Sequence, residues 1–415
     1  MFFLYRILIN LLLLISPIII IFRILKKKED PIRFQEKFCS FTLSRKKEKL
    51  IWFHGASVGE ILSVIPLIRQ LEKNKDIDQI LVTSNTLSSS KIFSKLKLKK
   101  TIHQFYPIDS NYFTKKFLEY WKPSIAIFID SEVWPNMIIN IKNKSIPLIL
   151  LNARITKKSF NKWMLFNSYA KKIFSKFNLC LTSNNKSKKY LKLLGAKKVI
   201  FLGNLKFSNI EGNETVLNKD LVKFFKTKKI WCASSTHKQE EILCARVHNQ
   251  LKKKYKNLLT IIIPRHIDRI PSILDELEKL NLKVHLHESK NKVSKNTDIY
   301  LVNSYGKTKS FYKISKTVFL GGSMIKHGGQ NPIEPAIYGS KIFYGPYNWN
   351  FDEIYDLLDS HKVSKKINNM NELSYNIQKF FIKNNKSNKI KSKIKKLGSE
   401  ILIQSLKQIN FFIKK

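Results

Sequence analysis

Paired cysteines are absent from this sequence. The four cysteines form no CxxC pair and are scattered along the chain, at Cys39, Cys180, Cys232 and Cys244. This spacing argues against a structural zinc site and against a disulfide scaffold, and it fits a protein that works in a reducing compartment.

Several motifs of nucleotide-dependent enzymes are missing as well. No GxGxxG follows a predicted strand, and the sequence contains no GxxxxGK[ST], no HExxH and no DxD-like pair at a strand end. These absences disfavour a dinucleotide-dependent redox enzyme, a P-loop ATPase and a metal-dependent sugar transferase of the DxD type. We therefore expect neither a metal nor another cofactor.

Acidic residues are scarce relative to basic ones, with 30 Asp+Glu against 76 Lys+Arg and a formal net charge of +46. Such an excess suits an anionic membrane surface, a phosphorylated substrate or nucleic acid. Lys, Asn and Ile are frequent throughout the chain, so a general compositional bias explains the charge as well as a membrane does. Nucleic acid is the weakest of these interpretations, because no RNP, KH or zinc-finger signature is visible.

The first 25 residues are strongly apolar. Their uncharged core runs from Ile7 to Phe22, and the basic block Lys26-Lys27-Lys28 follows closely. Because a bilayer core needs about 20 apolar residues, we expect an uncleaved anchor that spans the membrane or lies in its interface. A cleaved signal peptide is the alternative, but a small-residue cleavage pattern is missing. The basic flank places the rest of the chain in the cytoplasm.

From Leu50 onward, short apolar runs alternate with helical patterns, which predicts parallel sheets covered by helices on both faces. The alternation restarts after a polar stretch, so we expect two Rossmann-like domains. The predicted division is a membrane anchor at 1–28, a first domain at 29–207, a linker at 208–228 and a second domain at 229–415. The predicted strands are 50–53, 79–83, 101–106, 125–129, 147–151, 179–182, 199–202, 230–233, 259–263, 283–286, 299–302, 317–320 and 342–344, and residues 352–415 are predicted to be mostly helical.

The most informative segment lies between Val318 and Phe351. A short apolar run precedes the glycine pairs Gly321-Gly322 and Gly328-Gly329, and Asn331-Pro332-Ile333-Glu334 then has the pattern of a helix start. Asn suits the N-cap, Pro suits the first helical position, and Glu can reach back to the N–H of the cap. Backbone N–H groups at such a start favour an anion, and glycines allow close approach. We interpret the segment as a phosphate or nucleotide site; an ordinary capped helix is the alternative.

Charged residues follow three predicted strands of the first domain. Glu60 ends the loop HGASVGE, Asp130 follows a wholly apolar strand, and Lys206 lies in GNLKF. Enzymes with α/β sheets place their sites at such strand ends, so Glu60 is a candidate general base. The alternatives are that Glu60 stabilises a helix start, and that Asp130 or Ser131 caps a helix whose first turn contains Glu132.

The second domain has comparable strand ends. Pro264-Arg265-His266 follows one predicted strand, and the fork of Arg265 suits a phosphate. Ser234-Ser235-Thr236 follows another and offers hydroxyl and N–H groups to the same anion. A solvated arginine and a plain helix cap are equally good interpretations.

Taken together, these segments resemble the 3-deoxy-D-manno-octulosonic acid (Kdo) transferases. The resemblance covers nearly the whole chain in order, including the N-terminal anchor, and its last segment is the longest and most specific. The matching segments are HGASVGE at 54–60, IDSEVWPN at 129–136, NAR at 152–154, GNLKF at 203–207, ASSTH at 233–237, PRH at 264–266 and GGSMIKHGGQNPIEPAIYG at 321–339.

The resemblance implies a GT-B fold, with two Rossmann-like domains facing a central cleft. It implies inverting transfer of Kdo from CMP-Kdo to lipid IVA, without a metal, at the cytoplasmic face of the cell inner membrane. Nucleic acid is not an expected partner. The number of Kdo residues transferred, the oligomeric state and whether the anchor spans are left open. The alternatives are another GT-B nucleotide-sugar transferase acting on a membrane lipid, or a basic, membrane-tethered protein without enzymatic activity.

The resemblance also assigns roles to residues. Glu60 matches the general base, Asp130 a position that stabilises the transition state, and Lys206 its basic counterpart. This chain departs from the family pattern at Asp130 and Lys307, where Glu is usual, and at Gln330, where His is usual. Residues that match CMP-binding segments are Pro264, Arg265, Tyr305, Gly306, Lys307, Asn331, Pro332, Ile333 and Glu334, with Ser234, Ser235, Gly322 and Gly329 as further candidates.

Overall fold

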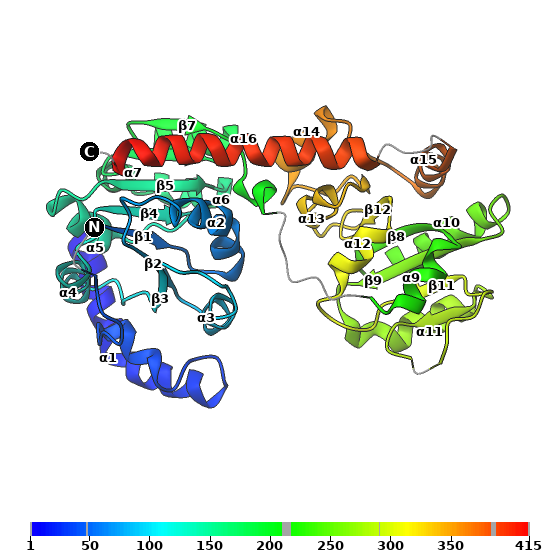
Figure 1. Cartoon of the computed structure of the whole chain (residues 1–415), viewed down its shortest axis with the longest axis horizontal. Helices are drawn as coiled ribbons and strands as arrows, with labels where there is room; N and C mark the ends of the chain where they lie inside the picture. Colours follow the sequence, from blue (N-terminus) through cyan, green and yellow to red (C-terminus); the bar gives the residue numbers. More distant parts are fainter. Residues whose placement is uncertain (1, 47–48, 210–216, 290, 383–386, 414–415) are drawn as a thin grey trace. The chain divides into compact units, whose positions relative to one another are not determined.

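The structure is a computed structural model, and it describes residues 2–46, 49–209, 217–289, 291–382 and 387–413 (Figure 1). The chain divides into two compact units. Unit 1 consists of residues 1–209 together with 398–415, and unit 2 consists of residues 210–397. Each unit contains one seven-stranded parallel sheet, as the alternation of apolar runs and helical patterns predicts.

In unit 1 the strands are ordered β3-β2-β1-β4-β5-β6-β7. Strand residues of both parities are buried, for example Trp52 and Phe53, so helices cover both faces of the sheet. The elements are α1 (Phe2–Leu25), η1 (Arg33–Phe38), β1 (Leu50–His54), α2 (Val58–Leu71), β2 (Gln79–Ser84), α3 (Leu87–Phe93), β3 (Thr101–Phe105), α4 (Asn111–Trp121), β4 (Ile125–Ile129), α5 (Pro135–Asn143), β5 (Leu148–Ala153), α6 (Lys157–Met164), α7 (Asn167–Phe174), β6 (Leu179–Thr182), α8 (Asn185–Leu193), β7 (Val199–Phe201) and η2 (Leu205–Ser208).

Unit 2 repeats this design, with strands ordered β10-β11-β9-β8-β12-β13-β14. Its core gathers apolar residues of the central strands and of the helices that cover them, such as Trp231, Leu251 and Phe319. The elements are α9 (Lys219–Lys226), β8 (Lys229–Thr236), α10 (Glu240–Lys252), β9 (Leu258–Pro264), η3 (Ile267–Arg269), α11 (Ile270–Glu278), β10 (Val284–Leu286), β11 (Ile299–Leu301), α12 (Thr308–Ile314), β12 (Thr317–Leu320), α13 (Ile333–Ile337), β13 (Lys341–Tyr344), α14 (Asp352–Ser360), β14 (Ser364–Lys366), α15 (Met370–Ile382) and α16 (Ser387–Ile413).

All thirteen predicted strands are confirmed to within a few residues at their ends, and the structure adds β14. The prediction that residues 352–415 are mostly helical is confirmed by α14, α15 and α16, although it did not include the short strand Ser364–Lys366. This strand is short, polar and at the edge of its sheet, and only its first residue is buried. An edge strand of this kind carries no apolar run that a sequence pattern could detect.

The C-terminal half of α16 packs on unit 1, although the sequence placed all of residues 229–415 in the second domain. The helix approaches closely because Gly398 has no side chain: a Cβ there would lie 2.3 Å from the carbonyl oxygen of Phe207. Ile409 and Ile413 are buried, and the Lys49 Nζ donates to the carbonyl oxygen of Ile413.

The predicted linker, 208–228, contains residues 210–216, which lie outside the described residues. Its second half forms α9, a helix that the polar composition did not indicate. Phe225 of α9 is buried beside Tyr300 and Phe311 of unit 2, so this part of the predicted linker is a packed element.

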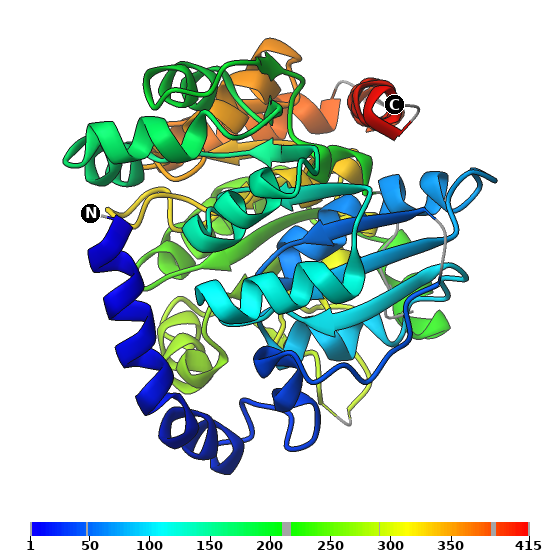
Figure 2. The same cartoon turned by 90° about the vertical axis from the view of Figure 1, so that its left-hand side faces the viewer.

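The first helix, α1, is the one helix among the described residues that is long and apolar enough to cross a membrane, judged by its length and composition alone. In Figures 1 and 2 it runs along the outside of unit 1 as a dark blue ribbon.

Candidate active site

The order of strands reverses at β1 in unit 1. The chain moves from β1 outward to β2 and β3, and then returns so that β4 pairs with the other side of β1. The carboxyl ends of β1 and β4 therefore form a topological switch point, and doubly wound sheets bind ligands at such points. Glu60 follows β1, and Asp130 follows β4.

Glu60 is the third residue of α2 and forms a capping box with Ser57. Its Oε2 accepts a hydrogen bond from the Ala56 N–H at 2.7 Å, and its Oε1 accepts one from the Ser57 hydroxyl at 2.7 Å. The side chain is half-buried. The structure thus bears out the helix-start interpretation of Glu60, and the cap also fixes the direction in which the carboxylate points.

Asp130 has a left-handed backbone conformation, with φ 61°, which aspartate adopts more readily than most residues. Its N–H donates to Leu151 at 2.9 Å, and its carbonyl accepts from the Arg154 N–H at 3.2 Å. Burial raises the pKa of Asp130 to about 6; Lys206 and Arg154 oppose this rise, and Glu60 adds to it. These charged groups therefore lie within electrostatic reach of one another.

Lys206 is half-buried in η2, directly after β7. Asn204 caps this short helix by accepting from the Lys206 N–H at 3.0 Å, and Asn152 accepts from the Leu205 N–H at 2.9 Å. Since Asn152 lies at the end of β5, two strand ends hold the backbone of Lys206. The structure thus brings together the three residues to which the sequence assigned catalysis.

The expectation that Asp130 or Ser131 caps a helix is wrong, because α5 begins only at Pro135. The cap comes instead from a distant residue that the sequence analysis missed. The carboxylate of Asp109 accepts from the N–H groups of Asn136 and Met137, at 3.0 and 2.8 Å. No local pattern relates residues that are 27 positions apart.

Glu132 is likewise not in the first turn of a helix. Its Oε2 accepts from the Trp134 indole at 2.7 Å and lies 3.2 Å from the Nε2 of His54, whose ring stacks on Tyr106. Burial alone would raise the pKa of Glu132, but the contacts with His54 and Trp134 hold it below its ordinary value. Glu132 therefore ties the end of β1 to the loop after β4.

In unit 2 the strand order reverses at β8, which pairs with β9 on one side and β12 on the other. The loop after β12 contains the glycine pairs, and a buried carboxylate holds it. Glu240 accepts from the N–H groups of Gly322, Ser323 and Met324, at 2.7, 3.1 and 3.0 Å, and from that of His237 at 3.0 Å. Burial raises the pKa of Glu240, and these backbone donors oppose the rise. The sequence analysis missed Glu240.

Two glycines are required in this loop for different reasons. A Cβ on Gly321 would lie 2.5 Å from the carbonyl oxygen of Ser235, so only glycine lets the two strand ends approach. Gly322 has φ +65°, a left-handed conformation that favours glycine. The carbonyl of Gly322 accepts from the Gly329 N–H at 2.7 Å, which joins the two glycine pairs into one compact loop.

The helix start predicted at Asn331 needs correction. Helix α13 begins at Ile333, is five residues long and has Pro332 at its N-cap position, without a side-chain capping bond. Asn331 accepts from the Ile333 N–H at 3.1 Å, and Glu334 is exposed. A helix of one turn has few aligned peptide dipoles. The N-terminus of α13 is therefore a weaker anion-binding group than the sequence pattern predicted.

The other predicted donor residues lie at the same carboxyl edge of the unit 2 sheet. Pro264 ends β9, and the exposed Arg265 follows it; Tyr305, Gly306 and Lys307 lie between β11 and α12. Ser234 is different, because it is buried at the end of β8 and its hydroxyl lies 2.8 Å from that of Tyr312. Its side chain is thus occupied inside the protein, whereas Ser235 is only half-buried.

Histidines surround the glycine loop, and the sequence analysis did not single them out as a group. The ring centroid of His237 lies 4.2 Å from that of His327 and 5.9 Å from that of His266. Burial and His327 lower the pKa of His237 to about 4. We therefore expect the ring of His237 to be neutral around physiological pH. Among the described residues, the three histidines belong to no group that could hold a metal ion.

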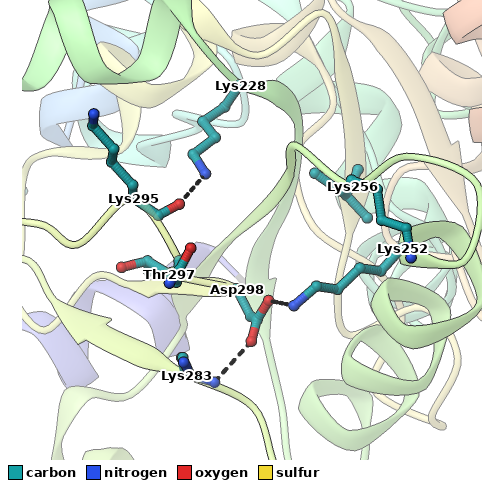
Figure 3. A pocket seen from close by; sticks show the side chains of 9 residues that line it. Lys228, Lys252, Lys256, Lys283, Lys295, Thr297 and Asp298 are labelled. Carbon is teal, nitrogen blue, oxygen red and sulfur yellow. Dashed lines mark hydrogen bonds and ion pairs between the residues drawn. The ribbon is translucent and has the colours of Figure 1, made fainter.

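A lysine-rich pocket of about 190 Å³ lies at the opposite edge of the unit 2 sheet (Figure 3). Its residues precede strands β8, β10 and β11, as Lys228, Lys283 and Asp298 show. Burial opposes ionisation of Asp298, but contacts with His248 and Lys252 hold its pKa well below the ordinary value. Because this pocket is at the amino ends of the strands, it is separate from the donor residues predicted above. Its lysines are Lys228, Lys252, Lys256, Lys283 and Lys295.

Two doubly wound units, each with a reversal of strand order in its sheet, define a protein with a GT-B-like fold. A solved structure supports this fold: UDP-GlcNAc 2-epimerase from Neisseria meningitidis bound to UDP-GlcNAc has a TM-score of 0.59 and 13% identity, covering 88% of this chain and 99% of that one.

Sequence comparisons show the family. The profile of the 3-deoxy-D-manno-octulosonic-acid transferase (kdotransferase) family matches residues 32–209. A 3-deoxy-D-manno-octulosonic acid transferase from Rickettsia bellii is 35% identical over 392 residues, covering 94% of this chain and 93% of its relative. The enzyme of that name from Haemophilus influenzae is 30% identical and covers 84% of both chains. The chain belongs to the Kdo transferase family of glycosyltransferases.

Proposed function

We propose that this protein transfers Kdo from CMP-Kdo to lipid IVA, with inversion at the anomeric carbon and without a metal ion. The observation that carries this proposal is the group formed by Glu60, Asp130 and Lys206 at the strand reversal of unit 1, in a chain of the Kdo transferase family. The proposal gives unit 1 the acid–base chemistry and unit 2 the donor nucleotide.

Glu60 acts as the general base. Its carboxylate takes the proton from a sugar hydroxyl of the acceptor while the hydroxyl oxygen bonds to the anomeric carbon of Kdo. The bond between that carbon and the phosphate oxygen breaks, and CMP leaves with the electron pair as a phosphate monoester. The capping bonds from Ala56 and Ser57 hold the carboxylate in one orientation, which favours proton transfer over a short, fixed distance.

Asp130 and Lys206 stabilise charge that develops in the transition state, as a preorganised pair at the same strand reversal. Support comes from the electrostatic coupling of Asp130 with both Lys206 and Glu60. Aspartate in place of the usual glutamate shortens the side chain by one methylene group, and the left-handed backbone at φ 61° sets where this shorter side chain points.

In unit 2, CMP binds along the carboxyl edge of the sheet. Arg265 and Lys307 neutralise the phosphate, the role that a metal ion has in other transferases. The glycine loop allows its backbone to approach the donor, and Glu334, which is exposed, accepts from the ribose hydroxyls. Gly322 and Gly329 keep that loop compact through the bond between them. Gln330 replaces the usual histidine with another neutral hydrogen-bonding group.

The protein works at the cytoplasmic face of the inner membrane, held by α1. The apolar composition of this helix supports membrane attachment. The formal charge of +46 favours an anionic membrane surface and an acceptor that carries phosphates.

A transfer assay tests the proposal. Detergent-solubilised full-length protein is mixed with lipid IVA and with CMP-Kdo generated in the same reaction, and the products are analysed by mass spectrometry. We expect product masses that increase by whole Kdo units, and the size of the largest product gives the number transferred.

A failed assay next to an active Kdo transferase control would overturn the proposed donor or acceptor. CMP and UDP binding would then separate the explanations. Binding of UDP in preference to CMP would indicate a different nucleotide-sugar donor, whereas binding of neither nucleotide would indicate a membrane-tethered protein without transferase activity.

A further inference from the structure

Helix α1 has one covered face along its whole length. The less exposed positions recur every three or four residues, which is the spacing of one face of a helix. A helix that leaves the protein to enter a bilayer would lose this pattern beyond its base. The positions that are buried or half-buried on this face are 2, 5, 6, 9, 13, 16, 20, 23 and 24.

The N-terminal end of α1 is joined to unit 1 by polar contacts. The Tyr5 hydroxyl donates to the Asp109 carboxylate at 2.6 Å. The Arg6 guanidinium donates to the side-chain oxygens of Asn136 and Asn111, at 3.1 and 2.9 Å. We call these contacts the α1 lock. Asn136 lies in the first turn of α5, and Asp109, which precedes α4, accepts hydrogen bonds from that turn. The lock therefore holds the N-terminal end of α1 against the body of unit 1.

Asp109 makes the lock more than a surface contact. Its side chain is almost fully buried, at 3% exposure. A buried carboxyl group that loses a hydrogen-bond donor is left incompletely satisfied inside the protein, so release of Tyr5 is unfavourable unless another donor replaces it.

The C-terminal end of α1 returns to the same unit. Arg23 and Lys37 both bind the buried carboxylate of Glu29, at 3.1 and 2.6 Å. Farther along, Arg33 donates to the carbonyl of His103 at 2.7 Å, which fixes this segment beside β3. Both ends of the helix are thus bound to unit 1.

This arrangement is incompatible with a spanning helix. At about 1.5 Å per residue, the 24 residues of α1 extend about 36 Å, and a bilayer core is about 30 Å thick. If α1 crossed the membrane, Tyr5 would lie on the opposite side from unit 1 and could not reach Asp109. We propose that α1 lies in the plane of the membrane interface, held parallel to it by the α1 lock and by the contacts around Glu29.

The outward face of α1 contacts lipid, at the boundary between the headgroups and the acyl chains. The outward residues are apolar, and the cations Lys26, Lys27 and Lys28 follow the helix directly, where they can bind anionic headgroups. The exposed apolar residues are Phe3, Leu4, Ile7, Leu8, Leu11, Leu12, Leu14, Ile15, Ile18, Ile19, Ile21, Phe22 and Leu25. This inference rests on the membrane location given in the proposed function, and on no step of the transfer reaction.

Protease accessibility tests the orientation. A neutral epitope is fused before Met1 and a second one after Lys415, and the full-length protein is expressed in a Gram-negative host. Inverted inner-membrane vesicles and intact spheroplasts are then treated with protease. We expect both epitopes to be cut in inverted vesicles and both to be protected in spheroplasts. Cleavage of the two epitopes from opposite sides would show that α1 spans and would overturn the inference.

The lock is tested by the double variant Tyr5→Phe/Arg6→Lys, which removes the hydroxyl and the guanidinium fork but keeps the charge. We expect part of the N-terminal epitope to move to the opposite face, while Tyr112→Phe, at an exposed tyrosine, leaves it in place. If the N-terminal epitope of the double variant stayed on the cytoplasmic face, the α1 lock would not be what holds the helix in the interface. If the parent protein were absent from the membrane fraction, the proposal that the outward face of α1 contacts lipid would be overturned. Transfer activity, assayed in the same vesicles, reports separately on the proposed function.

Discussion

The two units share one topology but differ in the groups at the reversal of strand order. In unit 1 ionisable side chains lie at this reversal, with Glu60 after β1 and Asp130 after β4. In unit 2 the corresponding position holds backbone N–H groups of a glycine loop, fixed from below by the buried Glu240. The same sheet topology thus places ionisable side chains at the reversal in one unit and a backbone loop in the other, and the proposed function assigns them proton transfer and donor binding.

This difference separates the expected effects of substitution. A side-chain change in unit 1 should alter the rate of transfer without altering nucleotide affinity. A change of Glu240, which holds the loop of unit 2, should alter nucleotide affinity first, because it disturbs the backbone that is proposed to contact the donor.

The largest effect is expected for Glu60→Gln. Loss of a general base lowers kcat by about 10²–10⁴-fold, and CMP affinity should stay the same. Glutamine also completes a capping box, so the melting temperature should change little. Transfer rate, calorimetric CMP binding and thermal unfolding are measured on the same preparation. Turnover equal to that of the parent protein would remove Glu60 from the mechanism.

A smaller effect is expected for Glu240→Gln. The amide group places N–H donors against the N–H groups of Gly322 and Ser323, so the loop loses an acceptor at a cost of about 1–3 kcal/mol. CMP affinity should fall by about 10- to 100-fold, measured by calorimetry. Glu241→Gln is the matched control, because the neighbouring carboxylate pairs with Arg269 instead, at 2.9 Å. The idea fails if both variants bind CMP equally well.

Asp109→Asn tests the structural carboxylate that supports the start of α5. Burial raises the pKa of Asp109 from 3.8 to about 7, so the folded protein retains a proton that the unfolded chain releases above about pH 4. The stability contributed by this proton is present below pH 4 and is lost as pH rises through 7. Asp109→Asn should reduce this decline in melting temperature between pH 5 and pH 8. Asp76→Asn, at an exposed position, should not, and equal pH profiles for the two variants would contradict this role.

Local patterns explain which features the sequence could predict. Most of the predicted strands are buried apolar runs, and the loops at their carboxyl ends follow from the parallel topology. The approximate positions of Glu60, Asp130 and the glycine loop were therefore predictable, although their proposed roles remain predictions. In contrast, β14 is polar and at the sheet edge, so it has no such signal.

The groups that support the site could not be found in this way. Asp109 binds the start of α5 across 27 positions, and Glu240 binds Gly322 across 82. Such contacts depend on how the sheet places distant loops side by side, which no local pattern records. The cap expected at Asn331 failed for a related reason. The surrounding loop sets the backbone there, so Pro332 takes the N-cap position and the helix starts one residue later than predicted, at Ile333.

The smallest predicted effect concerns Lys206→Met and appears in the pH dependence of transfer. Burial raises the pKa of Asp130 to about 6, and Lys206 opposes that rise. If transfer requires ionised Asp130, kcat/KM should fall as pH drops through about 6. Removing the lysine charge destabilises the carboxylate and raises its pKa further, so the acid limb should move to higher pH. Lys206→Arg keeps the charge and should leave the limb in place.

This experiment also tests whether the ionisable side chains of unit 1 work as one group. A lysine that only contacts substrate would change the height of the pH profile and leave its midpoint where it is. A shift of the midpoint in Lys206→Met but not in Lys206→Arg requires electrostatic coupling between Lys206 and a titrating group. The variant Lys307→Met in unit 2 should have a lower affinity for CMP, and the midpoint of its pH profile should stay the same. A midpoint shift in that variant as well would contradict the division of roles between the two units.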